Sequence, residues 1–393
     1  MANIPSNLPI RALVLAPFFS TGMNANRPVS VACVLAELAA VDVVTTDFDH
    51  MTKRHCKDLQ EPPFTHIYRL KTLPYRSNIS VLRLLSHLLF SIRAAAFVLK
   101  RRSQYEVVYV TLPFNFLAWF VLWISPARCK IIDVVDIWPD VLPFPRRFVR
   151  LLWPIFAIWR KFFDKAVAKA NVLLAVSDSF IEEASKFAGP SCRRRRFYIG
   201  DVKLQGAVEK DAKLTVAYIG NIGHLYDFET LLDAMEEAKQ GTVQLLIVGE
   251  GDRREWLLGE LRRRGLQHEY FGIIYDPPTL ANILSRAHVG FNGYLNTSAA
   301  FSYKANTYFA AGLPILNSMG GDLYNIVAQY GLGLNYVGGD RVSLIHCLES
   351  LQNSDLSSMS RNCTRFFDAE LERGAIRRDM LFFLKECLTV PMR

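Results

Sequence analysis

The chain has 393 residues and a formal net charge of +9; 51% of its residues are hydrophobic and 21% are charged. This length and composition suit two globular domains, each with its own core, and exclude a mainly disordered protein. The seven cysteines form no Cys-x-x-Cys pair and their number is odd, so neither a zinc framework nor a disulfide scaffold is expected, and a reducing cytosol fits best.

Charge is divided unevenly along the chain. Residues 1–200 hold 27 basic and 14 acidic side chains, a net charge of +13, whereas residues 201–393 hold 19 and 23, a net charge of −4. The basic half predicts an anionic partner for that half alone, and both nucleic acid and a phospholipid membrane carry such charge.

Two segments of the first half raise the question of export or membrane insertion. Residues 1–9 are polar, and the apolar run at 12–19 is short and lacks a basic leader, so export is not expected. Residues 107–125 are uncharged and long enough to span a bilayer. The favoured interpretation is instead a buried strand, a break at Pro113 and an apolar helix from about Phe114, because proline interrupts a spanning helix.

Short β-rich runs alternate with helical stretches from one end of the chain to the other. Strands are predicted at residues 12–16, 41–46, 107–111, 130–135, 172–176, 214–219, 243–248, 268–271, 289–292 and 314–317. This alternation predicts parallel sheets covered by helices, and its repetition predicts two doubly wound α/β domains. The boundary is placed within residues 189–213, where periodicity fails and Gly, Pro and charge accumulate.

The run of four arginines at 193–196 lies within this boundary. It is interpreted either as a solvated linker or as a group that touches phosphates. The residues alone do not separate the two.

Acidic residues follow one strand of the first half. Asp133 lies within the strand at 130–135, and Asp136 and Asp140 lie at or beyond its carboxyl end. Ligands of open α/β sheets bind at this edge, so Asp136 is a candidate for orienting or deprotonating a hydroxyl group. The alternative is an aspartate that holds the turn before Pro139.

Residues 144–170 mix cations with Trp and Phe, which suits a helix lying in a membrane interface. The membrane candidates are Arg146, Arg147, Arg150, Trp153 and Trp159. Their aromatic neighbours lie beside Leu, Ile and Val, so a membrane is favoured over nucleic acid. The alternative is that these aromatic rings belong to the core and the cations form a solvated face.

Two glycine-rich turns follow strands of the second half. The first, at 220–223, leads into a helix from about Asp227, and the second is 249–252. Glycines allow backbone amides to approach a phosphate at a helix N-terminus, although many such turns use glycine for geometry alone. Glu250 is a candidate for a ribose hydrogen bond or a helix cap.

A third candidate is the helix predicted to begin near Ser302. It carries Lys304 in its first turn, where the helix dipole opposes a cation. A bound anion would explain this placement, whereas the alternative is a surface lysine on an ordinary helix.

In combination, these segments resemble GT-B fold glycosyltransferases of family 4, in particular the bacterial capsule, exopolysaccharide and O-antigen enzymes. The matching segments are residues 26–28, 47–50 with Lys53, 83–87, 136–140, 218–223 with 226–227, 249–252, 302–304 and 308–314. They occur in the family's order and span nearly the whole chain.

The resemblance implies two Rossmann-like domains facing a central cleft. Residues 1–195 would form an acceptor-binding, membrane-associating domain and residues 205–375 a nucleotide-sugar-binding domain, while residues 376–393 form a helix returning to the first. It implies a nucleoside diphosphate sugar as co-substrate, UDP-sugar rather than GDP-sugar, and a polyprenyl-diphosphate-linked acceptor. No cofactor, metal or nucleic acid is expected, and transfer would retain anomeric configuration at the cytoplasmic face of the cell membrane.

The resemblance also assigns site residues. Catalysis is expected of Asp136, Lys304 and His224. Donor binding is expected of Gly220, Asn221, Gly223, Gly249, Glu250, Gly251, Ser302, Tyr303, Lys304 and Thr307. Acceptor binding is expected of Arg27, His50, Asp136 and Trp138.

Several positions depart from the family pattern. The Glu-x7-Glu pair of many relatives is replaced by Ala299 and Thr307, and the Arg and Lys that grip the diphosphate are replaced by Asn221 and His224. Asp136 stands where many relatives have a histidine. Two other functions are compatible with part of the pattern: a GT-B nucleotide-sugar epimerase, and a non-catalytic basic protein that binds membranes or nucleic acid.

Overall fold

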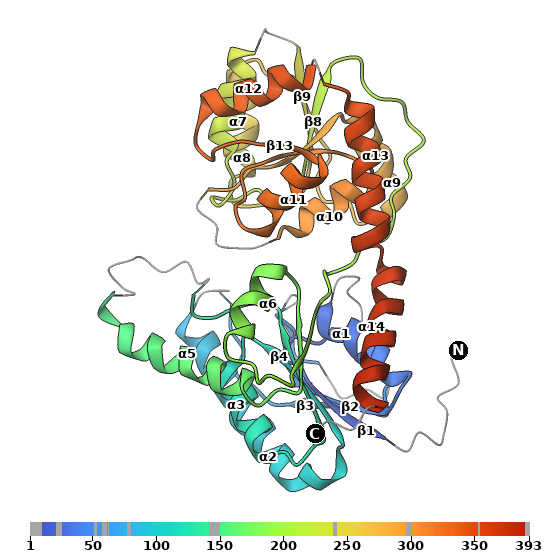
Figure 1. Ribbon diagram of the computed structural model, residues 1–393. Helices are drawn as coiled ribbons and strands as arrows, with labels where there is room; N and C mark the ends of the chain where they lie inside the picture. Colours follow the sequence, from blue (N-terminus) through green and yellow to red (C-terminus); the bar gives the residue numbers. More distant parts are fainter. Residues whose placement is uncertain are drawn as a thin grey trace. The chain divides into compact units, whose positions relative to one another are not determined.

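The computed structural model describes residues 10–20, 26–50, 53–56, 61, 63–76, 80–140, 150–238, 242–295, 301–352 and 354–389. The chain forms two compact units (Figure 1). Unit 1 comprises Met1–Tyr198 with Ile376–Arg393, and unit 2 comprises Ile199–Ala375. Each unit holds one parallel sheet covered by helices, which confirms the predicted doubly wound α/β architecture.

The sheet of unit 1 has the strand order β3-β2-β1-β4-β5-β6-β7. Its strands are β1 (Arg11–Leu15), β2 (Ala40–Thr46), β3 (His66–Leu70), β4 (Val107–Leu112), β5 (Cys129–Val134), β6 (Val172–Ala175) and β7 (Arg193–Arg196). Its helices are α1 (Arg27–Ala36), α2 (Val81–Arg101), α3 (Asn115–Ile124), α5 (Trp153–Val167), α6 (Asp178–Ser185) and α14 (Arg373–Thr389). The central strands read as continuous apolar runs because helices cover both faces of the sheet.

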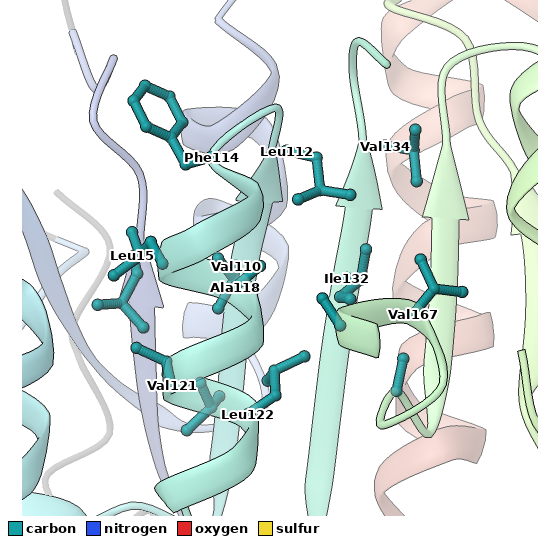
Figure 2. Packing of buried hydrophobic residues seen from close by; sticks show 14 of the residues in the cluster. Leu15, Val110, Leu112, Phe114, Ala118, Val121, Leu122, Ile132, Val134 and Val167 are labelled. Atoms are coloured by element: carbon teal, nitrogen blue, oxygen red, sulfur yellow. The ribbon is translucent and has the colours of Figure 1, made fainter. Parts of the chain in front are cut away.

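Alternate side chains of these strands enter two separate cores. Helices α2, α3, α5 and α6 cover one face, while α1 and α14 cover the other. On the first face, Ala118, Val121 and Leu122 of α3 point toward the strands that carry Leu15 and Val110 (Figure 2). On the second, Phe383 and Leu384 of α14 share a core with α1.

The segment 107–125 has the structure favoured from its sequence. Strand β4 is fully buried, and α3 begins two residues after Pro113. By length and apolar composition alone, one helix within the described ranges is able to cross a membrane, Val81–Gln104. Of its most apolar stretch, 44% is buried in the protein, and a helix packed in a protein core passes the same test.

The four-arginine run is strand β7, the edge strand of the sheet, paired in parallel with β6. Arg193 and Arg195 form ion pairs with Glu386 and Asp379 of α14, and Arg196 pairs with Asp178 of α6. The run is therefore not a linker, because its backbone completes the sheet, and carboxylates offset three of its four charges.

Unit 2 has a sheet of order β10-β9-β8-β11-β12-β13. Its strands are β8 (Leu214–Ile219), β9 (Val243–Val248), β10 (His268–Tyr270), β11 (Val289–Asn292), β12 (Ile315–Asn317) and β13 (Gly333–Asn335). Its helices are α7 (Phe228–Glu237), α8 (Arg254–Arg263), α9 (Pro277–Arg286), α10 (Tyr303–Ala310), α11 (Asp322–Tyr330), α12 (Arg341–Gln352) and α13 (Leu356–Phe366). Strands β8 and β11 are neighbours at the centre, so the loops that follow them lie at one edge of the sheet.

Candidate active site

The two glycine-rich turns of unit 2 pack directly on each other. The amide of Gly220 donates to the carbonyl of Val248 at 2.9 Å, and the amide of Ile222 donates to the carbonyl of Glu250 at 2.8 Å. Gly249 has φ +142°, and a Cβ there would lie 1.8 Å from the Gly220 carbonyl oxygen. Glycine is therefore required at 249 by the close approach of the two backbones.

This packing limits which amides of the first turn can meet a phosphate. Those of Gly220 and Ile222 are already bonded, which corrects the expectation that the whole turn from 220 to 223 faces the diphosphate. Asn221 and Gly223 remain the candidates of this turn. Gly251 supports the same packing, since a Cβ there would lie 2.2 Å from the carbonyl oxygen of Ile222.

Lys304 lies in the first turn of α10, as predicted, and its side chain is surrounded by tyrosines. Its Nζ is 3.6 Å from the ring centroid of Tyr226 and 4.6 Å from those of Tyr218 and Tyr294. The same nitrogen donates to the Tyr218 hydroxyl at 3.4 Å. The side chain also passes the first glycine turn, because a Cβ on Gly220 would lie 3.1 Å from Lys304 Cδ.

Lys304 is 9% exposed, and no carboxylate in the described part of the chain forms an ion pair with it. Burial lowers the pKa of Lys304 well below its usual value, since desolvation disfavours the charged form. Burial raises the pKa of the Tyr218, Tyr226 and Tyr294 phenols, so these groups stay neutral around Lys304. An anion bound here would supply the missing countercharge.

The other donor candidates of α10 lie at its N-terminal end. Ser302 is the N-cap, is buried, and its hydroxyl lies 3.3 Å from that of Tyr294. Tyr303 is 41% exposed. Thr307 is buried and donates to the Asp201 carboxylate at 3.1 Å, so a carboxylate is present beside this position although the glutamate of the family pattern is absent.

Glu250 and His224 are both on the surface of unit 2. Glu250 accepts from Arg254 at 2.9 Å and from the hydroxyl of Tyr270, and these bonds, that of Tyr270 first, lower the pKa of its carboxyl group. His224 is largely exposed, with Nε2 3.7 Å from an Asp252 oxygen. His224 therefore does not belong to the tyrosine cluster around Lys304.

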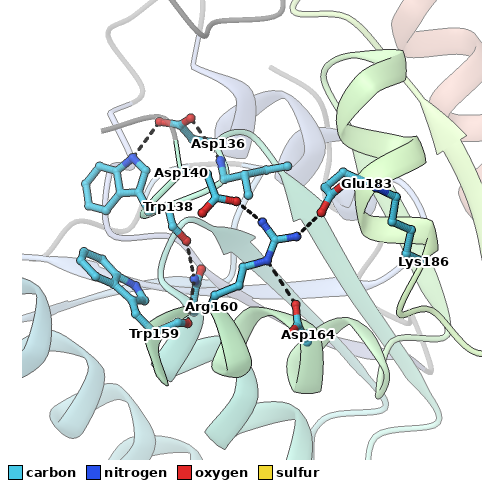
Figure 3. A network of polar contacts seen from close by, with 10 residues as sticks. Asp136, Trp138, Asp140, Trp159, Arg160, Asp164, Glu183 and Lys186 are labelled. Carbon is cyan, nitrogen blue, oxygen red and sulfur yellow. Dashed lines mark hydrogen bonds and ion pairs between the residues drawn. The ribbon is translucent and has the colours of Figure 1, made fainter. Parts of the chain in front are cut away.

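In unit 1, Asp136 follows β5, as predicted. Its carboxylate accepts from the indole of Trp138 at 2.8 Å and from the amide of Ile137 at 3.1 Å (Figure 3). Burial raises the pKa of Asp136, although the two hydrogen bonds and the charge of Arg83 oppose this shift. A carboxyl group with a raised pKa is suited to proton transfer.

His50 belongs to a cationic cluster near this aspartate. Its Nδ1 lies 2.8 Å from the Tyr75 hydroxyl and 3.4 Å from Lys53 Nζ. Burial, together with the charges of Lys53 and Arg83, lowers the pKa of His50 to about 4, so the ring is neutral near pH 7. His50 and Arg83 line a cavity of about 310 Å³.

Arg27 has a different role from the predicted acceptor contact. It is 4% exposed and forms a two-point ion pair with the fully buried Asp133, at 2.8 and 3.2 Å. It also donates to the carbonyl of Phe197, and Tyr109 donates to Asp133. A guanidinium enclosed in this way is inaccessible to an acceptor, so the prediction is corrected to a structural role.

Of the membrane candidates, Arg146 and Arg147 lie outside the described residues. Ala299, which stands at the first position of the Glu-x7-Glu pair, lies outside them as well. Arg150 and Trp153 are exposed, whereas Trp159 is partly buried and packs edge-to-face on Trp138.

Arg160 of α5 points into unit 1. It pairs with Asp140, Asp164 and Glu183 (Figure 3). It therefore fixes α5 to α6 and to the turn after Trp138.

Sequence reasoning missed the tyrosines around Lys304. Tyr218 is the penultimate residue of β8, and Tyr294 follows β11 by two residues. Because β8 and β11 are neighbours, the tyrosines at their carboxyl ends lie in one cluster. Both tyrosines are visible in the sequence, but predicting the cluster requires the strand order, which the sequence does not provide.

Comparisons with known proteins agree with this architecture. Residues 213–352, within unit 2, match the family "Glycosyl transferases group 1". No curated protein matches the sequence. Among solved structures, sucrose-phosphate synthase from Thermosynechococcus elongatus is similar at a TM-score of 0.71 and 15% identity, covering 96% of this chain and 99% of that one.

Two further structures illustrate the range of similar proteins. Anabaena HepE in complex with UDP-glucose has a TM-score of 0.62 at 14% identity, covering 96% of this chain and 100% of its own. WaaG, a glycosyltransferase involved in lipopolysaccharide biosynthesis, has a TM-score of 0.62 at 12% identity, covering 94% and 98%. The chain therefore has the GT-B fold and its second unit matches the glycosyl transferases group 1 family, which supports a glycosyltransferase activity.

Proposed function

We propose that the protein is a family 4 enzyme that transfers a sugar from a UDP-sugar to a lipid-linked sugar or glycan, with retention of anomeric configuration. The reaction belongs to bacterial surface polysaccharide synthesis at the cytoplasmic face of the membrane. The donor class is supported by the glycosyl transferases group 1 match and by the similar structure that holds UDP-glucose. The likeness to WaaG supports the pathway, since that enzyme is involved in lipopolysaccharide biosynthesis.

Lys304 is the observation that carries the proposal. Breaking a sugar–phosphate bond leaves negative charge on the departing diphosphate, and preorganised positive charge lowers that barrier. Lys304 is a buried lysine with aromatic rings around it instead of a carboxylate, so a diphosphate completes its environment. The amides of Asn221 and Gly223 and the N-terminus of α10 add partial positive charge. No metal is needed for this step.

Asp136 positions the acceptor hydroxyl for attack. In a front-face reaction the bond between the anomeric carbon and the diphosphate oxygen breaks as the acceptor oxygen bonds to the same carbon. The proton of the acceptor hydroxyl passes to the leaving phosphate. Asp136 accepts a hydrogen bond from that hydroxyl and orients it, while Trp138 holds the carboxylate in place.

The ribose is held without the Glu-x7-Glu pair. Asp201 brings a carboxylate beside Thr307, at 3.1 Å, and Glu250 offers a second one at the end of β9. Glu250 is paired with Arg254 and Asp201 with Arg373, so both carboxylates remain candidates for the ribose.

Unit 1 associates with an anionic membrane surface, not with nucleic acid. Exposed Trp153 begins α5, exposed Arg150 precedes it by three residues, and apolar side chains of α2 are exposed as well. Apolar and aromatic side chains interleaved with cations suit the headgroup region of a bilayer.

A ligand screen tests the proposal directly. UDP and UDP-sugars should raise the melting temperature more than GDP-sugars, because a ligand that binds only the folded state stabilises it. The stabilising donor is then incubated with membrane lipids and, separately, alone. Lipid-dependent sugar transfer supports the proposal, whereas epimerisation of the donor without lipid would replace it with the epimerase function.

A further inference from the structure

Unit 1 contains an apolar groove between α2, α3 and α5. Its volume is about 380 Å³, within the range of about 300 to 1,000 Å³ typical of ligand sites. We call it the apolar groove; its walls include Leu84, Leu88, Phe116, Ile155, Ile158 and Phe162. The walls come from three helices of one unit, so the groove exists without any contribution from unit 2.

Helix α2 is apolar on two sides, and only one is used by the core. Phe90, Ala94 and Val98 pack against the sheet. On the other side Leu85 and Leu88 are 48% and 47% exposed, and across the groove Ile158 of α5 is 57% exposed. A contiguous exposed apolar surface of this kind marks a binding site for an apolar partner.

The inner end of the groove carries polar atoms that the folded chain does not satisfy. His87 is 8% exposed, and its Nε2 has no hydrogen-bond partner among the described residues. The Oδ1 atom of the buried Asn115 is likewise without a partner within the described ranges, although its Nδ2 donates to the carbonyl of Trp138. Buried polar atoms are rarely left in this state, so a ligand with hydrogen-bonding groups at its end fits here, with a donor facing the Asn115 Oδ1 atom.

A positive charge lies next to this inner end. The Arg83 guanidinium is 5.3 Å from the ring centroid of Trp138, which lines the groove, and 5.6 Å from that of Phe18. Phe18 and Arg83 line the neighbouring cavity of about 310 Å³, which also contains His50 and Asp49. Thus an apolar groove and a polar cavity lie on either side of one arginine.

We propose that the apolar groove binds the hydrocarbon chain of the acceptor, a single isoprenoid chain whose phosphate binds Arg83 and whose sugar enters the polar cavity. The inference rests on the proposed function and specifies its acceptor. Charge complementarity selects this occupant, because a planar guanidinium is suited to phosphate and the groove walls are suited to hydrocarbon. The acceptor chain thus lies on the protein surface instead of remaining wholly in the bilayer.

Farnesyl phosphate, used below its micelle concentration, is the probe. Its binding is followed by the fluorescence of the tryptophans, two of which, Trp138 and Trp159, line the groove. Inorganic phosphate lacks the chain and farnesol lacks the phosphate, so both should bind at least tenfold more weakly. UDP binding, measured by calorimetry, reports the donor site independently.

Leu88→Arg is compared with Leu99→Arg on the same helix. The two leucines are similarly exposed, at 47% and 46%, and eleven residues, or about three turns, place them on one helix face. Only Leu88 lines the groove. Leu88→Arg should weaken farnesyl phosphate binding at least tenfold, Leu99→Arg less than twofold, and neither should change UDP binding.

Each outcome distinguishes binding in the groove from adsorption and from self-association. Equal losses in both variants would show adsorption to a general apolar face and overturn the inference, as would a dimer that Leu88→Arg dissociates. No probe binding in a protein that binds UDP and transfers sugar overturns the groove and leaves the proposed function standing. Selective probe binding without UDP binding supports the groove and removes the proposed donor.

Discussion

Lys304 lies in the first turn of α10, and its Nζ atom is 3.6 Å from the centre of the Tyr226 ring. Cation–π contacts at desolvated sites contribute about 2 kcal/mol, which is less than the loss of hydration that burial imposes on an ammonium group. The charge is thus held in a place where an incoming diphosphate improves its environment, and the first two predictions follow from this.

Lys304→Met should separate stability from function. Replacing a buried charge by an apolar side chain of similar length is neutral or stabilising, so the melting temperature should stay the same or rise. The lost charge-assisted hydrogen bond should weaken UDP binding by about 1.5 to 3 kcal/mol, roughly 10- to 150-fold, and abolish most turnover. Calorimetry and a transfer assay measure both; full turnover in the variant would remove Lys304 from the mechanism.

UDP affinity should fall as the pH rises above the pKa that Lys304 has in the free protein. Burial lowers the pKa of Lys304 in the free protein, and the diphosphate charge raises it again, so binding between these two pKa values takes up one proton. The terminal phosphate of UDP is almost fully ionised above about pH 7, since its second pKa is about 6. Calorimetry in buffers of different ionisation enthalpy reads the proton directly. Lys304→Arg keeps a permanent charge and should remove this dependence.

Gly249→Ala should disrupt the paired turns of unit 2. The new Cβ would lie 1.8 Å from the Gly220 carbonyl oxygen at a φ of +142°, so the two backbones must separate. We expect a lower melting temperature and weaker UDP binding. Gly259→Ala is the matched control: it lies in α8, a Cβ there meets nothing within 4 Å, and it should stabilise the protein by about 0.5 to 1 kcal/mol.

Arg27→Met should destabilise unit 1 without a specific effect on acceptor binding. Removing one partner of a buried ion pair costs about 3 to 5 kcal/mol, because Asp133 is left as an uncompensated buried charge. Urea unfolding measures the loss, and Asp133→Asn in the same chain should recover part of it. Arg128→Met breaks an exposed pair with Glu106 and should cost less than about 1 kcal/mol.

Neutralising Arg146, Arg147 and Arg150 should weaken binding to anionic vesicles and leave UDP binding unchanged. The expected loss is largest at low salt, because surface charges are screened over about 10 Å at 0.1 M. Co-sedimentation with vesicles and with a polynucleotide, each at two salt concentrations, measures the preference. Tighter binding to the polynucleotide would contradict the membrane assignment.

The sequence predicted the long buried strands well, because runs such as residues 107–111 are continuous and β-branched. Strands β3, β7 and β13 were missed, the last two for different reasons. Strand β13 has three residues, and the charge of β7 hides its backbone pairing until Glu386 and Asp379 of the distant α14 are placed beside it. Partners 180 to 200 residues away cannot be read from local pattern.

The site was predicted by position more successfully than by role. Lys304 lies in the first turn of its helix and Asp136 follows its strand, as expected, since strand ends and helix starts are local signals. The enclosure of Arg27 depended on Asp133, which is 106 residues away, and the tyrosines around Lys304 depended on strand order. The sequence therefore predicted the positions of these residues, whereas their side-chain contacts required the structure.

The position of helix α14 determines the order in which the two units can fold during translation. Phe383 and Leu384 complete the core that α1 forms on one face of the unit 1 sheet. During translation this face stays uncovered until residues 373–389 have left the ribosome, by which time all of unit 2 has emerged. Unit 2 is continuous in sequence and is able to fold first, so the order of folding should be the reverse of the order of synthesis.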